Sequence, residues 1–185
     1  MNPKQLIAQS RRLMERHDLM FDDPKPLARI LHKCLLQRLA DGEVLCKERE
    51  PGDELYFLLH GNIEVRKRDL TGNVRRLVTL KAPTMFGHMA LVDKSPRSAT
   101  CVSDGDSVVA VLDRRAYQAL LKKSDQMGTI FRHLLLSAMA SQLARANDEI
   151  HGLIDPTKPI GEDDDVTSEE GLFRASSTLE GWSAG

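Results

Sequence analysis

The sequence predicts a mainly β domain, a sandwich or a barrel, flanked by helices. From Gly42 to Asp113, short β-rich runs alternate with glycine-marked turns at intervals of roughly ten residues, which is typical of sandwiches and barrels. The segments on either side carry apolar residues at helical spacing. The chain has 185 residues, 41% of them hydrophobic and 29% charged, which is enough for one domain with extensions and a buried core.

Residues 1–39 are expected to form an N-terminal helical segment. The first helix is predicted over residues 3–20, because apolar residues recur near the helical period while basic residues fill the other face. Its apolar face consists of Leu6, Ile7, Leu13 and Met14. The stretch Asp22-Asp23-Pro24 ends this helix. A second helix, over roughly 25–38, has an apolar side at helical spacing, made of Leu27, Ile30, Leu31, Cys34 and Leu35.

Residues 40–124 are expected to form the β domain. Its β-rich runs are Glu43–Arg49, Glu54–His60, Asn62–Asp69, Val74–Leu80, Arg97–Ser103 and Ser107–Leu112. Turn sequences separate them, namely Pro51-Gly52-Asp53, Thr71-Gly72-Asn73 and Asp104-Gly105-Asp106, with Gly61 between two runs. Residues 81–96, which lie between the last long runs, are predicted to be a non-strand insertion.

After Asp113 the pattern is helical again. A short helix is predicted over Arg114–Lys123 and a long one from Asp125 to about Leu153, so residues 125–154 form a helical segment of their own. A narrow apolar stripe runs along the long helix: Leu136, Met139, Leu143, Ala146, Ile150 and Leu153. The stripe has two interpretations, an ordinary packed helix or the seam of a two-helix dimer. We expect a homodimer, because a helix of this length outreaches a small barrel.

Residues 155–185 form an acidic tail. It holds eight acidic and two basic residues, a charge of −6. Asp155-Pro156 ends the long helix and few apolar residues follow, so we expect this tail to be disordered. Leu172-Phe173 and Trp182 are isolated apolar points, which belong either to an unstructured end or to a short docking motif for a partner.

The composition argues against several classes of function. The net charge of −1 is unlike that of a dedicated nucleic-acid binder, and no apolar run approaches the ~20 residues of a membrane span. The three cysteines, Cys34, Cys46 and Cys101, lie far apart without CxxC spacing, which argues against a disulfide scaffold or a zinc site and indicates the reducing cytoplasm. The histidines show no HxH spacing, so we expect no metal site and no enzymatic activity.

One short segment has the chemistry to hold a phosphodiester anion. Such an anion needs backbone N–H groups, best supplied by a helix start that is approached closely through a glycine. Gly87 is that glycine, and His88–Leu91 is predicted to form the helical turn. The anion also needs a planar cation, which arginine provides better than lysine. Arg97 is the candidate cation and Ser98 the candidate hydroxyl. Each signal is weak when taken singly.

Their order along the chain strengthens the case. The sequence runs through Pro51-Gly52-Asp53, Leu55-Tyr56-Phe57-Leu58-Leu59-His60-Gly61, Phe86-Gly87-His88-Met89-Ala90-Leu91 and Pro96-Arg97-Ser98-Ala99-Thr100. From about residue 40 to 150 this order resembles the cyclic-nucleotide-binding domain family, which includes catabolite activator proteins, regulatory subunits of protein kinase A and cyclic-nucleotide-gated channels. The resemblance implies an eight-stranded jelly-roll barrel of the double-stranded β-helix type. It also implies a non-enzymatic regulatory sensor for cyclic AMP or cyclic GMP.

The resemblance implies a set of ligand-binding residues: Gly87, His88, Met89, Ala90, Leu91, Arg97, Ser98, Ser137 and Ser141. The two serines on the long helix, Ser137 and Ser141, are candidates for a purine edge, or else small residues at a helix–helix contact. Ser98 leaves the choice between adenine and guanine open.

His88 departs from the family pattern, which has a glutamate that accepts a hydrogen bond from the ribose 2′-hydroxyl. A neutral imidazole can still accept one bond. Three interpretations follow: a cyclic mononucleotide with a weakened ribose contact, a changed ligand such as a cyclic dinucleotide, or a degenerate pocket that serves as a ligand-independent protein-interaction module. A haem held by His88 or by a cysteine is a further rival, which the colour of the purified protein would reveal.

The output of the predicted sensor is expected to be another protein. Transcription factors of this family carry a helix-turn-helix domain after the long helix. The residues after Asp155 are acidic, show no helical period and would be repelled by phosphate. We therefore expect no DNA partner and no membrane partner, but an unidentified protein effector. No cofactor other than the cyclic nucleotide is expected.

Overall fold

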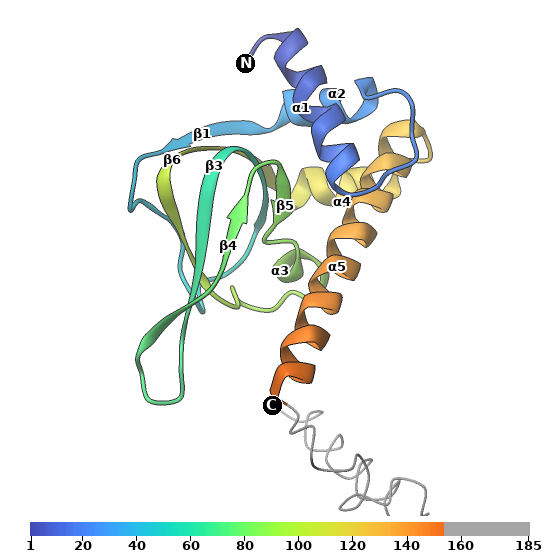
Figure 1. The fold of residues 1–185 in the computed structure, drawn as a ribbon. Helices are drawn as coiled ribbons and strands as arrows, with labels where there is room; N and C mark the ends of the chain where they lie inside the picture. Colours follow the sequence, from blue (N-terminus) through green and yellow to red (C-terminus); the bar gives the residue numbers. More distant parts are fainter. Residues whose placement is uncertain (154–185) are drawn as a thin grey trace, which may run out of the picture. The chain divides into compact units, whose positions relative to one another are not determined.

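The computed structural model describes residues 1–153 (Figure 1). The predicted acidic tail, with Leu172-Phe173 and Trp182, lies outside the described residues. The elements are α1 (Pro3–Arg16), α2 (Lys25–Lys33), β1 (Leu35–Leu39), β2 (Val44–Cys46), β3 (Glu54–Arg68), β4 (Val74–Lys81), β5 (Thr84–Phe86), α3 (Met89–Val92), β6 (Thr100–Asp113), α4 (Arg114–Lys122) and α5 (Gln126–Leu153). The predicted class, mainly β with flanking helices, is confirmed.

The strands form one antiparallel sheet that wraps into a barrel (Figure 1). The order of its main path is β1-β6-β3-β4, while β2 pairs with β6 and β5 pairs with β3. The two long strands β3 and β6 each join two of the predicted runs. They continue through Gly61 and Gly105, whose φ angles of 81° and 74° are accessible to glycine without steric cost. The expected breaks are therefore irregularities within single strands.

The first two helices are shorter than predicted, and the strand after them was not expected. Helix α1 ends at Arg16 rather than at residue 20, because Asp18 turns into the left-handed region with a φ of 51°. Helix α2 ends at Lys33, since Cys34 is already extended. Leu35 then begins β1, pairs with Val111 of β6 and is 73% exposed instead of lying on an apolar helix face.

The insertion at 81–96 is also partly a strand. Thr84–Phe86 forms β5 and pairs with the first half of β3, so that Phe86 lies opposite Tyr56. The short helix α3 follows at Met89–Val92, in agreement with the predicted helical turn. This part of the chain therefore enters the barrel as a strand and leaves the sheet at Gly87.

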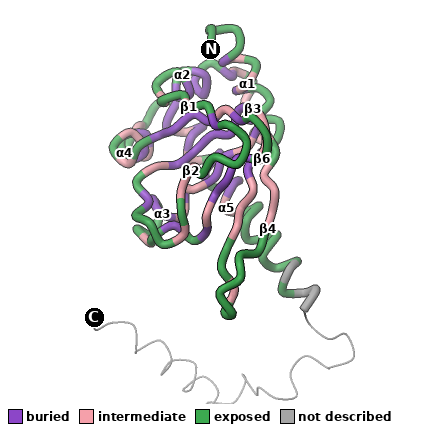
Figure 2. Tube along the Cα trace, turned by 90° about the vertical axis from the view of Figure 1, so that its left-hand side faces the viewer, coloured by how far each residue is buried: buried purple, intermediate pink, exposed green. Residues whose placement is uncertain are grey.

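Alternation along β3 divides the core into two layers, because successive side chains of a strand point to opposite faces. Leu55 and Phe57 pack with the helices α1, α2, α4 and α5. Tyr56 and Leu58 pack on the other face with residues of β5 and β6. Figure 2 shows both layers as buried segments, whereas the tip of the β3–β4 hairpin is exposed. The face that carries Tyr56 is the one that leads to the candidate site.

The predicted short and long C-terminal helices are both present as α4 and α5. The compact unit that contains the barrel comprises Met1–Gln142, and a second unit begins at Leu143. Ile130, Phe131 and Leu134 of α5 are buried in the first unit. No helix among the described residues is both long enough and apolar enough to span a membrane.

Candidate functional site

The turn after β5 places backbone N–H groups at the start of a short helix. Gly87 leaves the strand with a φ of 75°, and His88 is the N-cap of α3. The His88 carbonyl accepts hydrogen bonds from the N–H groups of Leu91 and Val92 at 3.0 and 3.1 Å. Only the N–H groups before Leu91, those of Met89 and Ala90, precede the first hydrogen bond of this short helix. They are the candidate donors of the turn predicted over His88–Leu91.

Arg97 is held in place by its backbone and its side chain. Its N–H donates to the Glu50 carbonyl at 2.8 Å, and its carbonyl accepts from the Arg49 N–H at 2.8 Å. The guanidinium Nη1 donates to the Gly87 carbonyl at 3.0 Å, and Nη2 donates to the Tyr56 hydroxyl at 2.9 Å. The residue is 6% exposed. The arginine and glycine that lie ten positions apart in the sequence therefore share a hydrogen bond.

A side chain at position 87 would crowd the neighbours of Gly87. A Cβ at this position would lie 2.9 Å from Nη1 of Arg97 and 3.0 Å from Cδ2 of Tyr56. The positive φ is a second reason, since side chains strain the left-handed region. Glycine thus allows both the turn and the close approach of the guanidinium to the backbone.

The partners of Arg97 leave its charge unbalanced. Among the described residues no carboxylate forms an ion pair with Arg97, and its Nε has no hydrogen-bond partner. Burial raises the pKa of Tyr56, so its hydroxyl stays neutral. A buried charge is costly unless it is paired and hydrogen-bonded. The arrangement is suited to an anion that accepts from Nε.

A second arginine ties α3 to its surroundings. Arg114 at the start of α4 forms an ion pair with Asp53 at 2.7 Å through Nε. Its Nη2 donates to the carbonyls of Gly52 at 2.9 Å and Ala90 at 3.2 Å. Gly52 lies against Ala90, with no room for a Cβ. The Pro51-Gly52-Asp53 turn, predicted only as a turn, is therefore a support for α3.

The structure places the remaining predicted site residues unevenly. His88 is buried at 4% exposure, Ala90 and Leu91 are buried, and Met89 is half-buried. Ser98 is exposed beside Arg97.

The two predicted serines are on α5. The Ser137 hydroxyl donates to the His17 carbonyl at 2.8 Å, in a contact between α5 and the end of α1. This is the helix–helix contact that was the alternative to a purine contact. Ser141 is exposed.

Tyr56 and Arg114 were not identified from the sequence as site residues. Tyr56 contacts Arg97 through its hydroxyl and its ring, whose centre lies 4.9 Å from the guanidinium carbon. Tyr56 lies in β3 opposite Phe86, the residue before Gly87. This position would have identified Tyr56, but it requires knowledge of the strand register.

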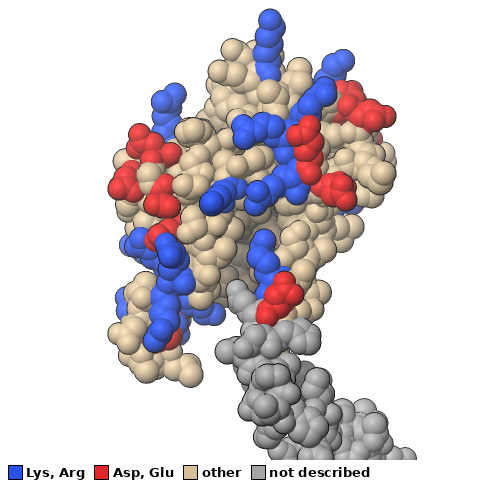
Figure 3. All heavy atoms as spheres, viewed as in Figure 1, with Lys and Arg blue, Asp and Glu red and all other residues tan. Residues whose placement is uncertain are grey.

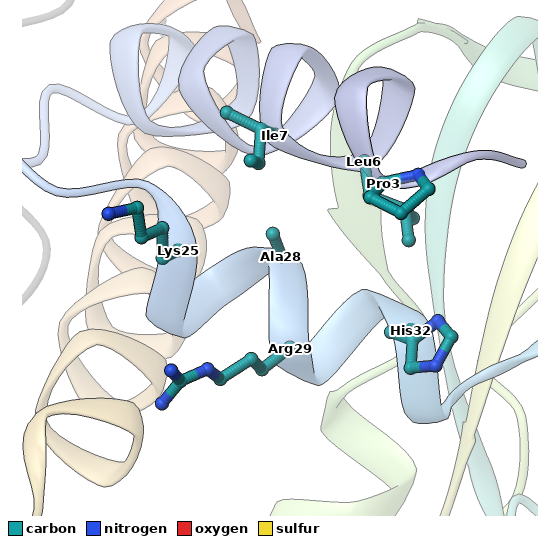
Figure 4. Close-up of a pocket in the computed structure, with 7 residues that line it drawn as sticks. All are labelled: Pro3, Leu6, Ile7, Lys25, Ala28, Arg29 and His32. Atoms are coloured by element: carbon teal, nitrogen blue, oxygen red, sulfur yellow. The ribbon is translucent and has the colours of Figure 1, made fainter.

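A cavity between α1 and α2 and a group of basic side chains on the β3–β4 hairpin are separate from the segment 86–100. A cavity of about 270 Å³ between α1 and α2 has an apolar lining (Figure 4). Its lining residues are Pro3, Leu6, Ile7, Lys25, Ala28, Arg29 and His32, none of them from the segment 86–100. Basic side chains also gather over the β3–β4 hairpin, at the lower left of Figure 3. There Arg66 and Arg76 pair with Glu64, and Arg75 pairs with Asp69.

Comparison with known proteins identifies one matching family. The family described as "Cyclic nucleotide-binding domain" matches residues 36–124. A CRP-like cAMP-activated global transcriptional regulator of Mycobacterium tuberculosis is 26% identical over 113 residues, which cover 61% of this chain and 49% of the relative. A cAMP-dependent protein kinase regulatory subunit of Dictyostelium discoideum is 33% identical over 90 residues, 47% of this chain and 28% of the relative. The chain thus spans half or less of the length of these relatives.

Solved structures share the fold. A cyclic nucleotide-binding domain from Methylobacillus flagellatus superimposes with a TM-score of 0.71 at 22% identity, covering 85% of this chain and 86% of that one. The catabolite activator protein of Thermus thermophilus gives a TM-score of 0.64 at 25% identity, covering 74% of this chain and 62% of that one. The barrel and its flanking helices are therefore shared with these proteins.

Proposed function

We propose that this chain is a regulatory sensor that binds a cyclic nucleotide and signals to a protein partner. The match of residues 36–124 to the family described as "Cyclic nucleotide-binding domain" supports this proposal. The cyclic phosphate accepts hydrogen bonds from Arg97 and from the backbone N–H groups at the start of α3. The ligand-binding residues of this proposal are Gly87, His88, Met89, Ala90, Leu91, Arg97 and Ser98.

One observation carries the proposal. Arg97 is buried, the Gly87 carbonyl and the Tyr56 hydroxyl that accept from its side chain are neutral, and its Nε has no partner among the described residues. A cyclic phosphodiester carries one negative charge and two free oxygens, which suits a planar guanidinium beside a helix start. The unpaired Arg97 therefore supports ligand binding over a degenerate domain that binds no nucleotide. In a degenerate domain the cost of burying this charge would have no compensation.

Cyclic AMP is the ligand we favour. The relatives from Mycobacterium and Dictyostelium are both described by their response to cAMP. His88 stands where the family pattern has a carboxylate, so the ribose contact in this proposal is a hydrogen bond to a neutral imidazole. Such a bond is weaker than one to a carboxylate, and the affinity for a cyclic mononucleotide is lower accordingly.

Calorimetric titration of the full chain with cyclic AMP, cyclic GMP and a cyclic dinucleotide tests the proposal. We expect saturable binding of a cyclic mononucleotide with one site per chain. Binding of the cyclic dinucleotide alone would assign a different ligand to the same pocket. Absence of heat with every ligand, in a protein that is folded by circular dichroism, would contradict the proposal and favour the ligand-independent interaction module.

We also propose that the chain forms a homodimer through α5. Leu136, Leu143 and Ile150 are spaced by seven residues and are 63%, 63% and 57% exposed. A seven-residue repeat of exposed apolar side chains is typical of a two-helix seam. Sedimentation of the full chain should give a dimer that Leu143→Asp dissociates, while Ala144→Asp, the same charge off the stripe, leaves it intact. A monomer in the unmodified protein would contradict the seam.

We propose that the protein is located in the cytoplasm. All three cysteines are free thiols, and thiols stay reduced in that compartment. The proposed function also includes a protein effector that receives the signal. Affinity capture with and without cyclic AMP would identify this effector.

A further inference from the structure

Two cysteines face each other across the sheet, near Arg97. Cys46 of β2 is the direct partner of Cys101 of β6 in the antiparallel register. Directly opposite residues of such a pair have Cα atoms about 4.5–5.5 Å apart and side chains on one face. That separation lies within the range of about 4.4–6.8 Å found for disulfides. The register therefore places the two cysteines opposite each other, next to a bulge between Val44 and Cys46, where a disulfide between neighbouring strands is sterically accessible.

The two cysteines also belong to one side-chain cluster, in which the partly buried Cys46 packs against buried residues that include Cys101. Cys101 acts on the Cys46 thiol as a hydrogen-bond partner through its side chain and its backbone. Arg97 lies near enough to act on both sulfurs electrostatically. Cys101 is 7% exposed, whereas Cys46 is half-buried. A small oxidant can thus reach Cys46 first, with Cys101 directly behind it.

The surroundings separate the reactivities of the three cysteines. The hydrogen bond from Cys101, together with Arg97, lowers the pKa of Cys46 to about 7, although its burial and Glu50 act in the opposite direction. The bond to Cys46 and burial raise the pKa of Cys101. Burial and Asp113 raise the pKa of Cys34 to about 12. Since the thiolate is the reactive form, Cys46 is the nucleophile and Cys34 is inert.

We propose that Cys46 and Cys101 form a reversible disulfide, a thiol modification site that joins β2 to β6 beside Arg97. The oxidant is a hydroperoxide such as hydrogen peroxide. The Cys46 thiolate attacks one peroxide oxygen, the O–O bond breaks, and the hydroxide that leaves takes up a proton to become water. Cys46 is then a sulfenic acid. The Cys101 sulfur attacks the Cys46 sulfur, the S–O bond breaks, and the Cys101 proton leaves with the hydroxide as a second water.

The reaction consumes two thiols and one molecule of hydrogen peroxide. The two thiols are oxidised to one disulfide, and hydrogen peroxide is reduced to two water molecules. A dithiol reductant reverses the reaction by thiol–disulfide exchange through a mixed disulfide. In a reducing compartment such a bond is transient and serves redox sensing rather than stability. This site requires no nucleotide, so its test is independent of the proposed function.

Peptide mapping tests the site directly. Cleavage after lysine and arginine places the three cysteines on separate peptides, residues 34–38, 39–47 and 98–114. The full chain is reduced, freed of reductant, treated with hydrogen peroxide at a low molar excess and alkylated before digestion. We expect a cross-linked pair of peptides 39–47 and 98–114, an alkylated Cys34, and loss of the cross-link after treatment with dithiothreitol.

Three variants complete the experiment. Cys34→Ser should form the same cross-link. Cys46→Ser should leave Cys101 as an alkylated thiol, and Cys101→Ser should let Cys46 proceed to the sulfinic acid. The proposal is overturned if the unmodified chain carries Cys46 as a sulfinic acid without a cross-link, if it does not oxidise at all, or if Cys34 reacts at a comparable rate.

Discussion

Arg97 and the arginines of the β3–β4 hairpin carry the same charge in opposite surroundings. Arg97 is 6% exposed and donates to a backbone carbonyl and a tyrosine hydroxyl, both neutral. The side chains of Arg75 and Arg76 are 71% and 64% exposed, and each forms an ion pair with a carboxylate. The hairpin thus pairs its cations with carboxylates in solvent, whereas Arg97 is buried and forms no ion pair among the described residues.

Under the proposed function, this difference separates a cation that binds a ligand from cations that form ion pairs on the surface. An exposed ion pair contributes about 0–1 kcal/mol to stability, and water screens it. A buried charge costs several kcal/mol unless an opposite charge meets it. The fold holds Arg97 in spite of this cost, through Gly87, Tyr56 and the backbone at residues 49–50.

Replacement of the buried Arg97 should have the largest effect on cyclic AMP binding, and replacement of an exposed hairpin arginine should have almost none. Arg97→Ala should weaken cyclic AMP binding about 100- to 1,000-fold, because the loss of one partner of a buried charge pair costs about 2–5 kcal/mol. Arg76→Ala removes the same side chain from the hairpin and should change the affinity less than about twofold. Calorimetric titration of both variants checks this. Equal affinities for the two would remove the distinction between pocket and surface.

Two glycines allow a similar comparison. Gly87 and Gly72 both have positive φ, 75° and 88°. A Cβ at Gly87 would meet Arg97 and Tyr56, whereas one at Gly72 in the hairpin would meet nothing within 4 Å. Both Gly→Ala variants should lose about 1 kcal/mol of unfolding free energy through backbone strain.

Only Gly87→Ala should weaken cyclic AMP binding as well, by about tenfold or more, because it displaces the guanidinium from its place. Denaturant titration and calorimetry on the two variants separate strain from site geometry. Weakened binding in Gly72→Ala would show that the loss reflects general instability.

His88→Glu places a carboxylate in the candidate site, the group with which the hairpin arginines already pair. We expect cyclic AMP to bind about tenfold more tightly, because a hydrogen bond from the ribose hydroxyl to a carboxylate is worth about 1.5–3 kcal/mol. His88→Gln, an uncharged control, should bind with an affinity close to that of the unmodified chain. A weaker affinity of His88→Glu would indicate that the carboxylate neutralises Arg97 instead of meeting a ribose.

The smallest expected effect is on the pH dependence of binding. The pKa of Cys46 is lowered to about 7 by the hydrogen bond from Cys101 and by Arg97. Above that pH the thiolate partly compensates Arg97 and repels an anionic ligand; below it the thiol is neutral. The affinity of the reduced protein for cyclic AMP should therefore fall about threefold between about pH 6 and about pH 8, within the tenfold that one pKa unit represents. Cys46→Ser should remove most of this fall, and an unchanged slope would assign it to another group.

The local elements of the candidate site agree with the sequence prediction more closely than the strands do. Gly87, Arg97 and the helical turn between them follow from local spacing, and the structure joins them by a hydrogen bond. Tyr56 and Arg114 escaped prediction because their contacts come from the register. The Tyr56–Arg97 bond spans 41 positions and the Arg114–Asp53 bond spans 61. No local pattern carries such information.

The strands differed for a related reason. Leu35–Leu39 reads as a continuation of an apolar helix face, but its pairing with Ser107–Val111 of β6 makes it a strand. Tertiary pairing overrides local propensity in such a segment. Gly61 and Gly105 read as turns, yet both β3 and β6 continue through them. A glycine shows where the chain can bend, and the partner strand decides whether it does.

The Nε–H signal of Arg97 tests the central claim most directly. Nuclear magnetic resonance of ¹⁵N-labelled protein resolves arginine Nε–H groups, and the signals of Arg97 and Arg76 are assigned by their loss in Arg97→Lys and Arg76→Lys. On addition of saturating cyclic AMP, the Arg97 signal should move downfield as Nε donates to the phosphate, while the Arg76 signal stays in place. An Arg97 signal that does not move when cyclic AMP is bound would contradict the account.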